Sequence, residues 1–150
     1  MSKSETRCEI VRHMARAFFA CAWADYEEEY GDTNLSGCDV MDVMPDELEP
    51  SAVYAAFDLC VMLEKQHGMH LTDIFEHARE MSLEAAIEGD YSGDREKSPE
   101  MFGHYAAMGA MGHGVNLHDA LGSKAARWVD TPWREYGYFE WCDERFPIAA

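Results

Sequence analysis

Apolar side chains recur every three or four residues along most of this chain, and capping and turn residues separate the segments that they mark. The first segment follows Ser2-Lys3-Ser4-Glu5, which has the spacing of a capping box, and it ends near Gly31. Its apolar residues form two stripes, so we expect this long helix to lie at the centre of the core. The pattern predicts a mainly α fold.

Three further helices are delimited by similar signals. The second is predicted over residues 50–67, with proline at its first position, and the third over residues 72–88. The fourth begins after Ser98-Pro99, a cap residue followed by a helix-starting proline. The predicted apolar face of the second helix contains Val53, Phe57, Cys60 and Leu63.

The fourth helix contains an unusual number of glycines. Gly103, Gly109 and Gly112 each cost about 1 kcal/mol of helix stability relative to alanine. We therefore expect these positions to pack closely against a neighbouring element.

Less regular segments lie between and after these helices. Residues 31–50 combine turn formers with apolar side chains and predict an ordered loop with a short helical turn. A short helix is predicted near 117–127, and an irregular aromatic-rich segment follows it. Within that segment, the alternation in Tyr136–Glu140 is compatible with a short strand. We expect residues 1–150 to form one helical bundle of about four to five helices.

The composition points to the cytoplasm. The N-terminus has no signal-peptide layout, and no window approaches the roughly 20 apolar residues that span a bilayer. The five cysteines are scattered without a close pair, which is typical of reduced thiols.

Negative charge dominates the chain and is segregated within it. The sequence has 29 acidic and 12 basic residues and a formal net charge of -17, which repels polyanions and attracts basic surfaces. Residues 17–64 contain no lysine or arginine. The candidate partner-binding residues in this interval are Asp25, Glu27, Glu28, Glu29, Asp32, Asp39, Asp42, Asp46, Glu47 and Glu49.

These acids have a spacing that suits phosphate mimicry. Asp25 and Glu29 are four residues apart, which is roughly 6 Å along a helix, whereas B-DNA places a phosphate every ~3.4 Å along each strand. A helix end followed by an acidic loop can therefore imitate a phosphate track. The alternative is that the acids serve solubility alone.

Histidines suggest an alternative function as a metal-dependent enzyme. His70, Asp73 and His77 have the i, i+3, i+7 spacing of one helical face, and such side chains are ligands of zinc. His113 and His118 form a second pair after the glycine-rich helix. Because no H-E-x-x-H pattern, nucleophile elbow or phosphate-binding glycine motif accompanies them, we predict no catalytic residue, no metal and no cofactor.

Two segments carry a resemblance to known proteins. Phe102–Val115 (FGHYAAMGAMGHGV) and Gly37–Pro45 (GCDVMDVMP) resemble segments of an uncharacterised family of small bacteriophage and prophage proteins. The chain departs from that family at Asn116–Asp119. The resemblance implies a bacterial host cytoplasm, where phages use small acidic proteins of the anti-CRISPR and anti-restriction types to occupy nucleic-acid grooves.

We therefore expect a non-enzymatic inhibitor whose partner is a basic nucleic-acid-binding host protein or complex, with no direct binding to nucleic acid or membrane. A phage structural or accessory homo-oligomer is a third hypothesis. A homodimer formed through the fourth helix also stays open.

Overall fold

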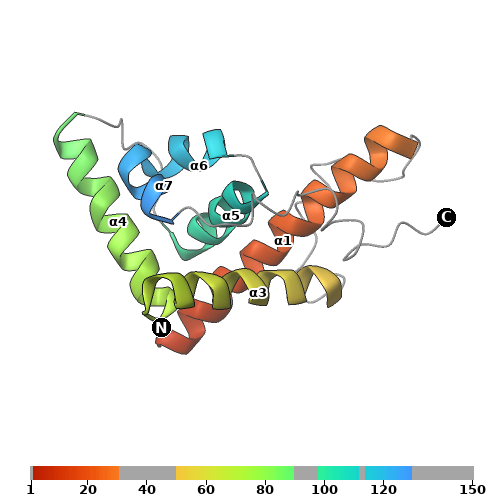
Figure 1. Cartoon of the computed structure of the whole chain (residues 1–150), viewed down its shortest axis with the longest axis horizontal. Coiled ribbons are helices and arrows are strands. Elements are labelled where there is room, and N and C mark those ends of the chain that lie inside the picture. The colour runs from red at the N-terminus through yellow and green to blue at the C-terminus, as the bar shows by residue number, and fades with distance from the viewer. Residues whose placement is uncertain (1, 31–49, 90–97, 112–113, 130–150) are drawn as a thin grey trace.

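The computed structural model describes residues 2–30, 50–89, 98–111 and 114–129, and within them all regular structure is helical (Figure 1). This architecture confirms the predicted mainly α fold class. The helices, in chain order, are α1 (Lys3–Tyr30), α3 (Pro50–His67), α4 (Leu71–Ile87), α5 (Pro99–Ala110), α6 (Gly114–Leu121) and α7 (Ser123–Val129).

The predicted caps form at the starts of α1 and α5. Ser2 Oγ accepts a hydrogen bond of 3.1 Å from the Glu5 amide. Ser98 Oγ accepts a bond of the same length from the Met101 amide, and Pro99 occupies the first turn. These bonds satisfy first-turn amides that have no partner within the helix, so the helices begin where the sequence predicted.

α1 is the central element, as predicted. It crosses α3 and packs along α5 (Figure 1), and its Ile10, Met14 and Phe18 are fully buried. α4 packs against α7, and α6 lies between α5 and α7. The other large, fully buried side chains include Leu59, Leu63, Leu71, Ile74, Phe102, Leu117 and Val129.

The glycines of α5 allow the expected close packing. A Cβ atom built at Gly103 would overlap the carbonyl oxygen of Ile10 in α1. One built at Gly109 would lie 2.7 Å from Leu117 Cδ2 in α6. Glycine therefore sets the distance from α5 to both of its neighbours.

The prediction of one helix near residues 117–127 is wrong, because the chain breaks there into α6 and α7. Gly122 between them has φ of 84°, a left-handed conformation that disfavours other residues. The Gly122 amide donates a 2.8 Å hydrogen bond to the His118 carbonyl, and α6 ends there. The freed Leu121 carbonyl accepts a 2.6 Å hydrogen bond from the buried Ser82 hydroxyl, so the break leaves this polar group satisfied.

The prediction that Phe57 belongs to the buried face of α3 is also wrong. That face runs through Ala56, Leu59 and Leu63, and Phe57 points away from it with 42% of its surface exposed. Tyr54 and Val61, at helical spacing from Phe57, are 63% and 46% exposed. We call Tyr54, Phe57 and Val61 the α3 stripe.

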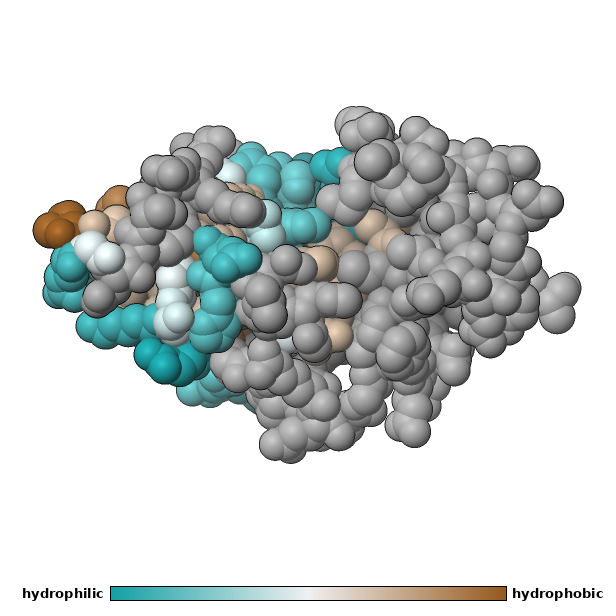
Figure 2. Space-filling view, turned by 90° about the horizontal axis from the view of Figure 1, so that it is seen from above, coloured by the Kyte–Doolittle hydropathy of each residue, from teal (hydrophilic) through white to brown (hydrophobic). Residues whose placement is uncertain are grey.

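Exposed apolar surface also occurs at the far end of α4, where Figure 2 shows brown atoms beside hydrophilic ones at the left of the view. Leu83 and Ile87 are exposed there. Among the described helices, none is both long and apolar enough to cross a bilayer. The predicted loop at 31–49 and the C-terminal aromatic segment with Tyr136–Glu140 lie outside the described residues.

Candidate functional site

Four of the predicted partner-binding acids belong to the last two turns of α1. They are Asp25, Glu27, Glu28 and Glu29, and the last turn contains no basic residue. The negative end of the helix dipole lies at the same place, so folding alone favours cations there. The other six predicted acids lie outside the described residues: Asp32, Asp39, Asp42, Asp46, Glu47 and Glu49.

The basic residues of α1 lie toward its other end, where several form ion pairs. Lys3 Nζ lies 2.9 Å from Asp73 Oδ1 on α4. Arg7 Nη2 lies 2.9 Å from Glu64 Oε1 on α3. α1 is therefore electrostatically polarised along its length, with bases in its first half and acids in its last turns.

The acidic end of α1 lies on the same side of the molecule as the beginning of α3 (right in Figure 1). The interval without lysine or arginine, residues 17–64, includes this end of α1 and the α3 stripe. The exposed apolar side chains of the α3 stripe and the acids of α1 thus belong to one stretch of sequence without lysine or arginine.

The first predicted histidine cluster does not converge on one point. His70 precedes α4 and caps it, because its Nδ1 accepts a 3.2 Å hydrogen bond from the Thr72 amide. Asp73 forms its ion pair with Lys3 of α1. The ring of His77 packs against that of Trp128, with 4.6 Å between the ring centroids. Within the described residues, no three or more histidine, cysteine or acidic side chains are placed to hold a metal ion.

The other histidines also have local partners. His118 Nδ1 lies 3.3 Å from Ser123 Oγ, whereas His113 lies outside the described residues. His67 packs 4.1 Å from the same Trp128 ring that His77 contacts. Burial lowers the pKa of His67, and the charge of His77 lowers it further.

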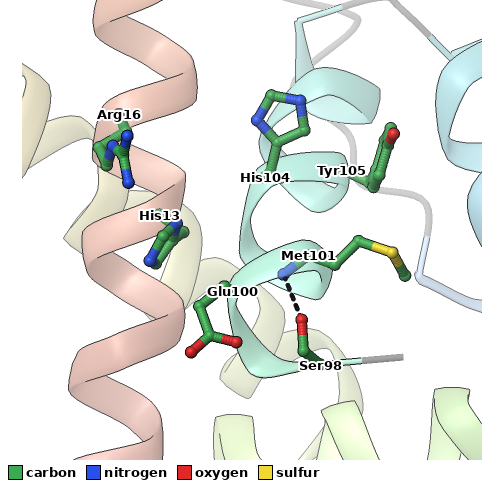
Figure 3. A pocket seen from close by; sticks show the side chains of 7 residues that line it. All are labelled: His13, Arg16, Ser98, Glu100, Met101, His104 and Tyr105. Carbon is green, nitrogen blue, oxygen red and sulfur yellow. Dashed lines mark hydrogen bonds between the residues drawn. The ribbon is translucent and has the colours of Figure 1, made fainter. Parts of the chain in front are cut away.

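A pocket between α1 and α5 brings together residues that sequence reasoning did not connect (Figure 3). Its volume is about 350 Å³. α1 contributes two nitrogen-bearing side chains one turn apart, and α5 contributes the opposite wall and its cap. The lining residues are His13, Arg16, Ser98, Glu100, Met101, His104 and Tyr105.

The side chains around the pocket include a fixed cation, two imidazoles and carboxylates. His13 and Arg16 of α1 and His104 of α5 line the pocket together (Figure 3). Burial lowers the pKa of His104, and the nearby charges of His13 and Arg16 lower it further. Two carboxylates lie close to these groups, because Glu9 Oε1 is 3.2 Å from His13 Nε2 and Glu100 lines the pocket.

The sequence contains only part of the signal for this pocket. His13 and Arg16 have helical i, i+3 spacing, but His104 lies on a helix far along the chain, so only the packing of α5 on α1 joins them. The close approach predicted for Gly103 was the available clue, and it did not identify the partner helix.

No family model, curated protein or solved structure matches this chain.

Proposed function

We propose that this protein is a phage- or mobile-element-encoded acidic binding protein of the anti-CRISPR or anti-restriction type. It inhibits a host defence complex by occupying a basic nucleic-acid-binding groove with phosphate-like carboxylates. The proposal is supported by the resemblance to phage proteins and by the charge of -17.

The observation that carries the proposal is the acidic end of α1. Glu27, Glu28 and Glu29 occupy its last turn without a basic neighbour there. Each carboxylate beside a helix C-terminus is unfavourable by about 0.3–1 kcal/mol at low ionic strength. Binding to a basic partner accounts for acids at a position where helix stability favours bases.

The α3 stripe favours a protein partner over a role in solubility alone. Tyr54, Phe57 and Val61 expose apolar surface within the interval that has no lysine or arginine. Tyrosine and other aromatic side chains are enriched in protein interfaces, and charge complementarity adds association rate and specificity. In the proposed interface, the acids attract the basic groove and the α3 stripe packs at the edge of the groove.

The charge requirement is tested by reversing two acids at the end of α1. In pull-downs from bacterial lysate followed by mass spectrometry, the wild-type chain recovers a nuclease or CRISPR subunit, and it inhibits DNA binding by that purified complex. A Glu27→Lys, Glu28→Lys double variant weakens this inhibition by at least roughly tenfold, because two attractive charges become repulsive.

The matched control is Glu76→Lys, Glu80→Lys on the exposed face of α4, which makes the same change in net charge. It leaves inhibition within about twofold of the wild type, allowing for the small effects of remote exposed charges. Equal losses in the two double variants would show that bulk charge alone matters and would overturn the proposal.

The apolar contribution has its own pair of variants. Phe57→Ala in the α3 stripe weakens partner binding, by about 1 kcal/mol or more for an interface anchor. Leu83→Ala, at a side chain of α4 that is 53% exposed, is the control and leaves binding unchanged. If Phe57→Ala binds the partner as the wild type does, the α3 stripe is not part of the interface.

A further inference from the structure

Three aromatic rings from three helices meet where α7 approaches the end of α3 and packs on α4. The ring of His67, the last residue of α3, packs on the Trp128 indole of α7 with 4.1 Å between the ring centroids and 39° between the ring planes. The ring of His77 in α4 packs on the same indole at 4.6 Å and 52°. We propose that these rings form a pH-sensitive contact, which holds α7 in place while both imidazoles are neutral and loosens it when they are protonated.

The surroundings of His67 oppose a positive charge on its ring. An imidazolium loses hydration on burial, and the charge of His77 repels it, so the pKa of His67 is lowered from the ordinary value of 6.5. The C-terminal position in α3 acts in the opposite direction, because the helix dipole favours a cation there. Burial and His77 outweigh the dipole, and the neutral ring is therefore the form that suits the packed structure.

The other charged groups near the three rings are of both signs. Two nearby acids, Glu64 and Asp73, form ion pairs with bases of α1. α6, which also packs on α7, contains His118 and the exposed Asp119. The remaining charged residues within one turn of the rings on α3, α4 and α7 are Lys65, Glu76, Arg79, Glu80, Lys124 and Arg127. The one-signed field of the acidic end of α1, which favours cations, is thus not repeated on the described helices here.

Protonation of His67 is linked to the docking of α7. The pKa of His67 is below 6.5 while its ring is packed on Trp128, and it returns toward 6.5 when that contact opens. Because the packed state has the lower pKa, the contact gives its full stabilisation above about pH 6.5. The stabilisation is lost as pH falls from there through the lower pKa of the packed state. A proton on His77, which is exposed, adds a second positive charge beside the same indole and opposes packing further.

α7 is the element that responds, because its structure depends on its contacts. It has seven residues and follows Gly122, whose positive φ separates it from α6. Isolated helices shorter than about 12–15 residues are marginal in water. Apart from Trp128, the helix is anchored by the small or medium-sized buried side chains of Ala125, Ala126 and Val129. A weaker contact at Trp128 therefore opens α7 more readily than it opens the long helix α1.

Hydrogen exchange of the whole chain, followed by mass spectrometry, tests the proposal. Amide protection in α7, corrected for the intrinsic pH dependence of exchange, falls by roughly threefold or more between about pH 7.5 and about pH 5.5, relative to protection in α1. Equal changes in α7 and α1 would overturn the proposal.

A His67→Phe, His77→Phe double variant keeps two aromatic rings beside Trp128 and removes both titrating groups. The pH-dependent loss of α7 protection is absent in this variant. His104→Phe is the matched control, since burial also lowers the pKa of His104 but its ring belongs to α5. The control loses α7 protection at low pH as the wild type does. A loss that persists in the double variant would contradict the role assigned to the two rings.

NMR titration of the histidine ring signals provides a test that needs no variant. In the wild-type chain the His67 signals titrate with a midpoint below 6.5, because the packed ring resists protonation. A midpoint above 6.5 would show that Trp128 stabilises the imidazolium as a cation–π partner, and the proposal would then be overturned.

Discussion

Glu64 is the side chain through which three helices meet. Arg7 donates to both of its oxygens, at 3.2 Å from Nε to Oε2 and 2.9 Å from Nη2 to Oε1. The Leu71 amide at the start of α4 donates to Oε2 at 2.8 Å. The Cys60 thiol donates to Oε1 at 3.6 Å within α3. One carboxylate therefore joins α1 to the turn between α3 and α4.

The protonation state of Glu64 links this contact to pH. Burial acts to raise its pKa, but the hydrogen bonds from Arg7 and Leu71 outweigh burial and hold the pKa below the ordinary value of 4.5. Because the folded pKa is the lower one, the stabilisation is complete above the unfolded pKa. It is lost as pH falls through the folded pKa.

We predict that Glu64→Gln lowers the free energy of unfolding at neutral pH by about 1–3 kcal/mol, since Arg7 loses its charged partner. The difference from wild type shrinks as pH falls below about 4.5, where Glu64 of the unfolded chain becomes protonated, and it is lost once pH has fallen through the lower pKa of the folded protein. Urea unfolding at a series of pH values measures both effects, with Glu80→Gln on the exposed face of α4 as control. A difference that is independent of pH would contradict this account.

At the scale of the elements, the contact between α1 and α5 depends on one missing side chain. Gly103→Ala adds a methyl group against the Ile10 carbonyl, which is backbone and cannot rotate away. We expect a loss of about 1–3 kcal/mol in unfolding free energy, despite the higher helix propensity of alanine.

Gly109→Ala is the matched comparison for Gly103→Ala, because its new methyl group meets only the end of the flexible Leu117 side chain. Its cost is smaller, and thermal unfolding followed by circular dichroism ranks the two variants. If Gly109→Ala is the more damaging substitution, the backbone contact at Ile10 does not set the helix distance.

Helix positions were predictable where the signal is local. Ser2, Pro50 and Ser98 mark helix starts by capping chemistry that acts within a few residues, and the structure places the starts of α1, α3 and α5 accordingly. The break at Gly122 was missed because leucine and alanine before it and alanine after it favour helix, and only the left-handed φ reveals it. The exposure of Phe57 depended on which face of α3 meets α1.

The candidate sites also differ in whether their signal is local in the sequence or depends on helix packing. The acids of α1 could be found from sequence, since charge segregation is visible without a fold. The pocket could not, because His13 and His104 become neighbours only when α5 packs on α1. Long-range pairing of helices is decided by the fit of whole faces, to which single residues give little guidance.

At the scale of the whole molecule, charge and apolar surface are unevenly distributed. Ion pairs such as Lys3–Asp73 and Arg7–Glu64 lie near the start of α1, whereas acids without basic neighbours in sequence gather at its end. A net charge of -17 opposes compaction through self-repulsion. Under the proposed function, the same repulsion is relieved when a basic partner covers the acidic end.

Because the acids at the end of α1 are proposed to serve binding and are unfavourable for the helix, we predict that the variant that fails to bind is the more stable protein. Glu27→Lys, Glu28→Lys places cations at the C-terminal end of α1 and lowers the net negative charge, so the free energy of unfolding rises by about 1 kcal/mol at low ionic strength. Thermal unfolding without and with about 1 M salt measures this gain, which disappears when the Debye length falls to about 3 Å.

The control variant Glu76→Lys, Glu80→Lys changes net charge equally but lies within α4, away from the end of α1, and therefore gains less stability. Equal gains in both variants would assign the effect to net charge alone. A loss of stability in the Glu27→Lys, Glu28→Lys variant would mean that these glutamates stabilise the fold. Folding would then explain the charge at the end of α1, and this charge would no longer support the proposed binding function.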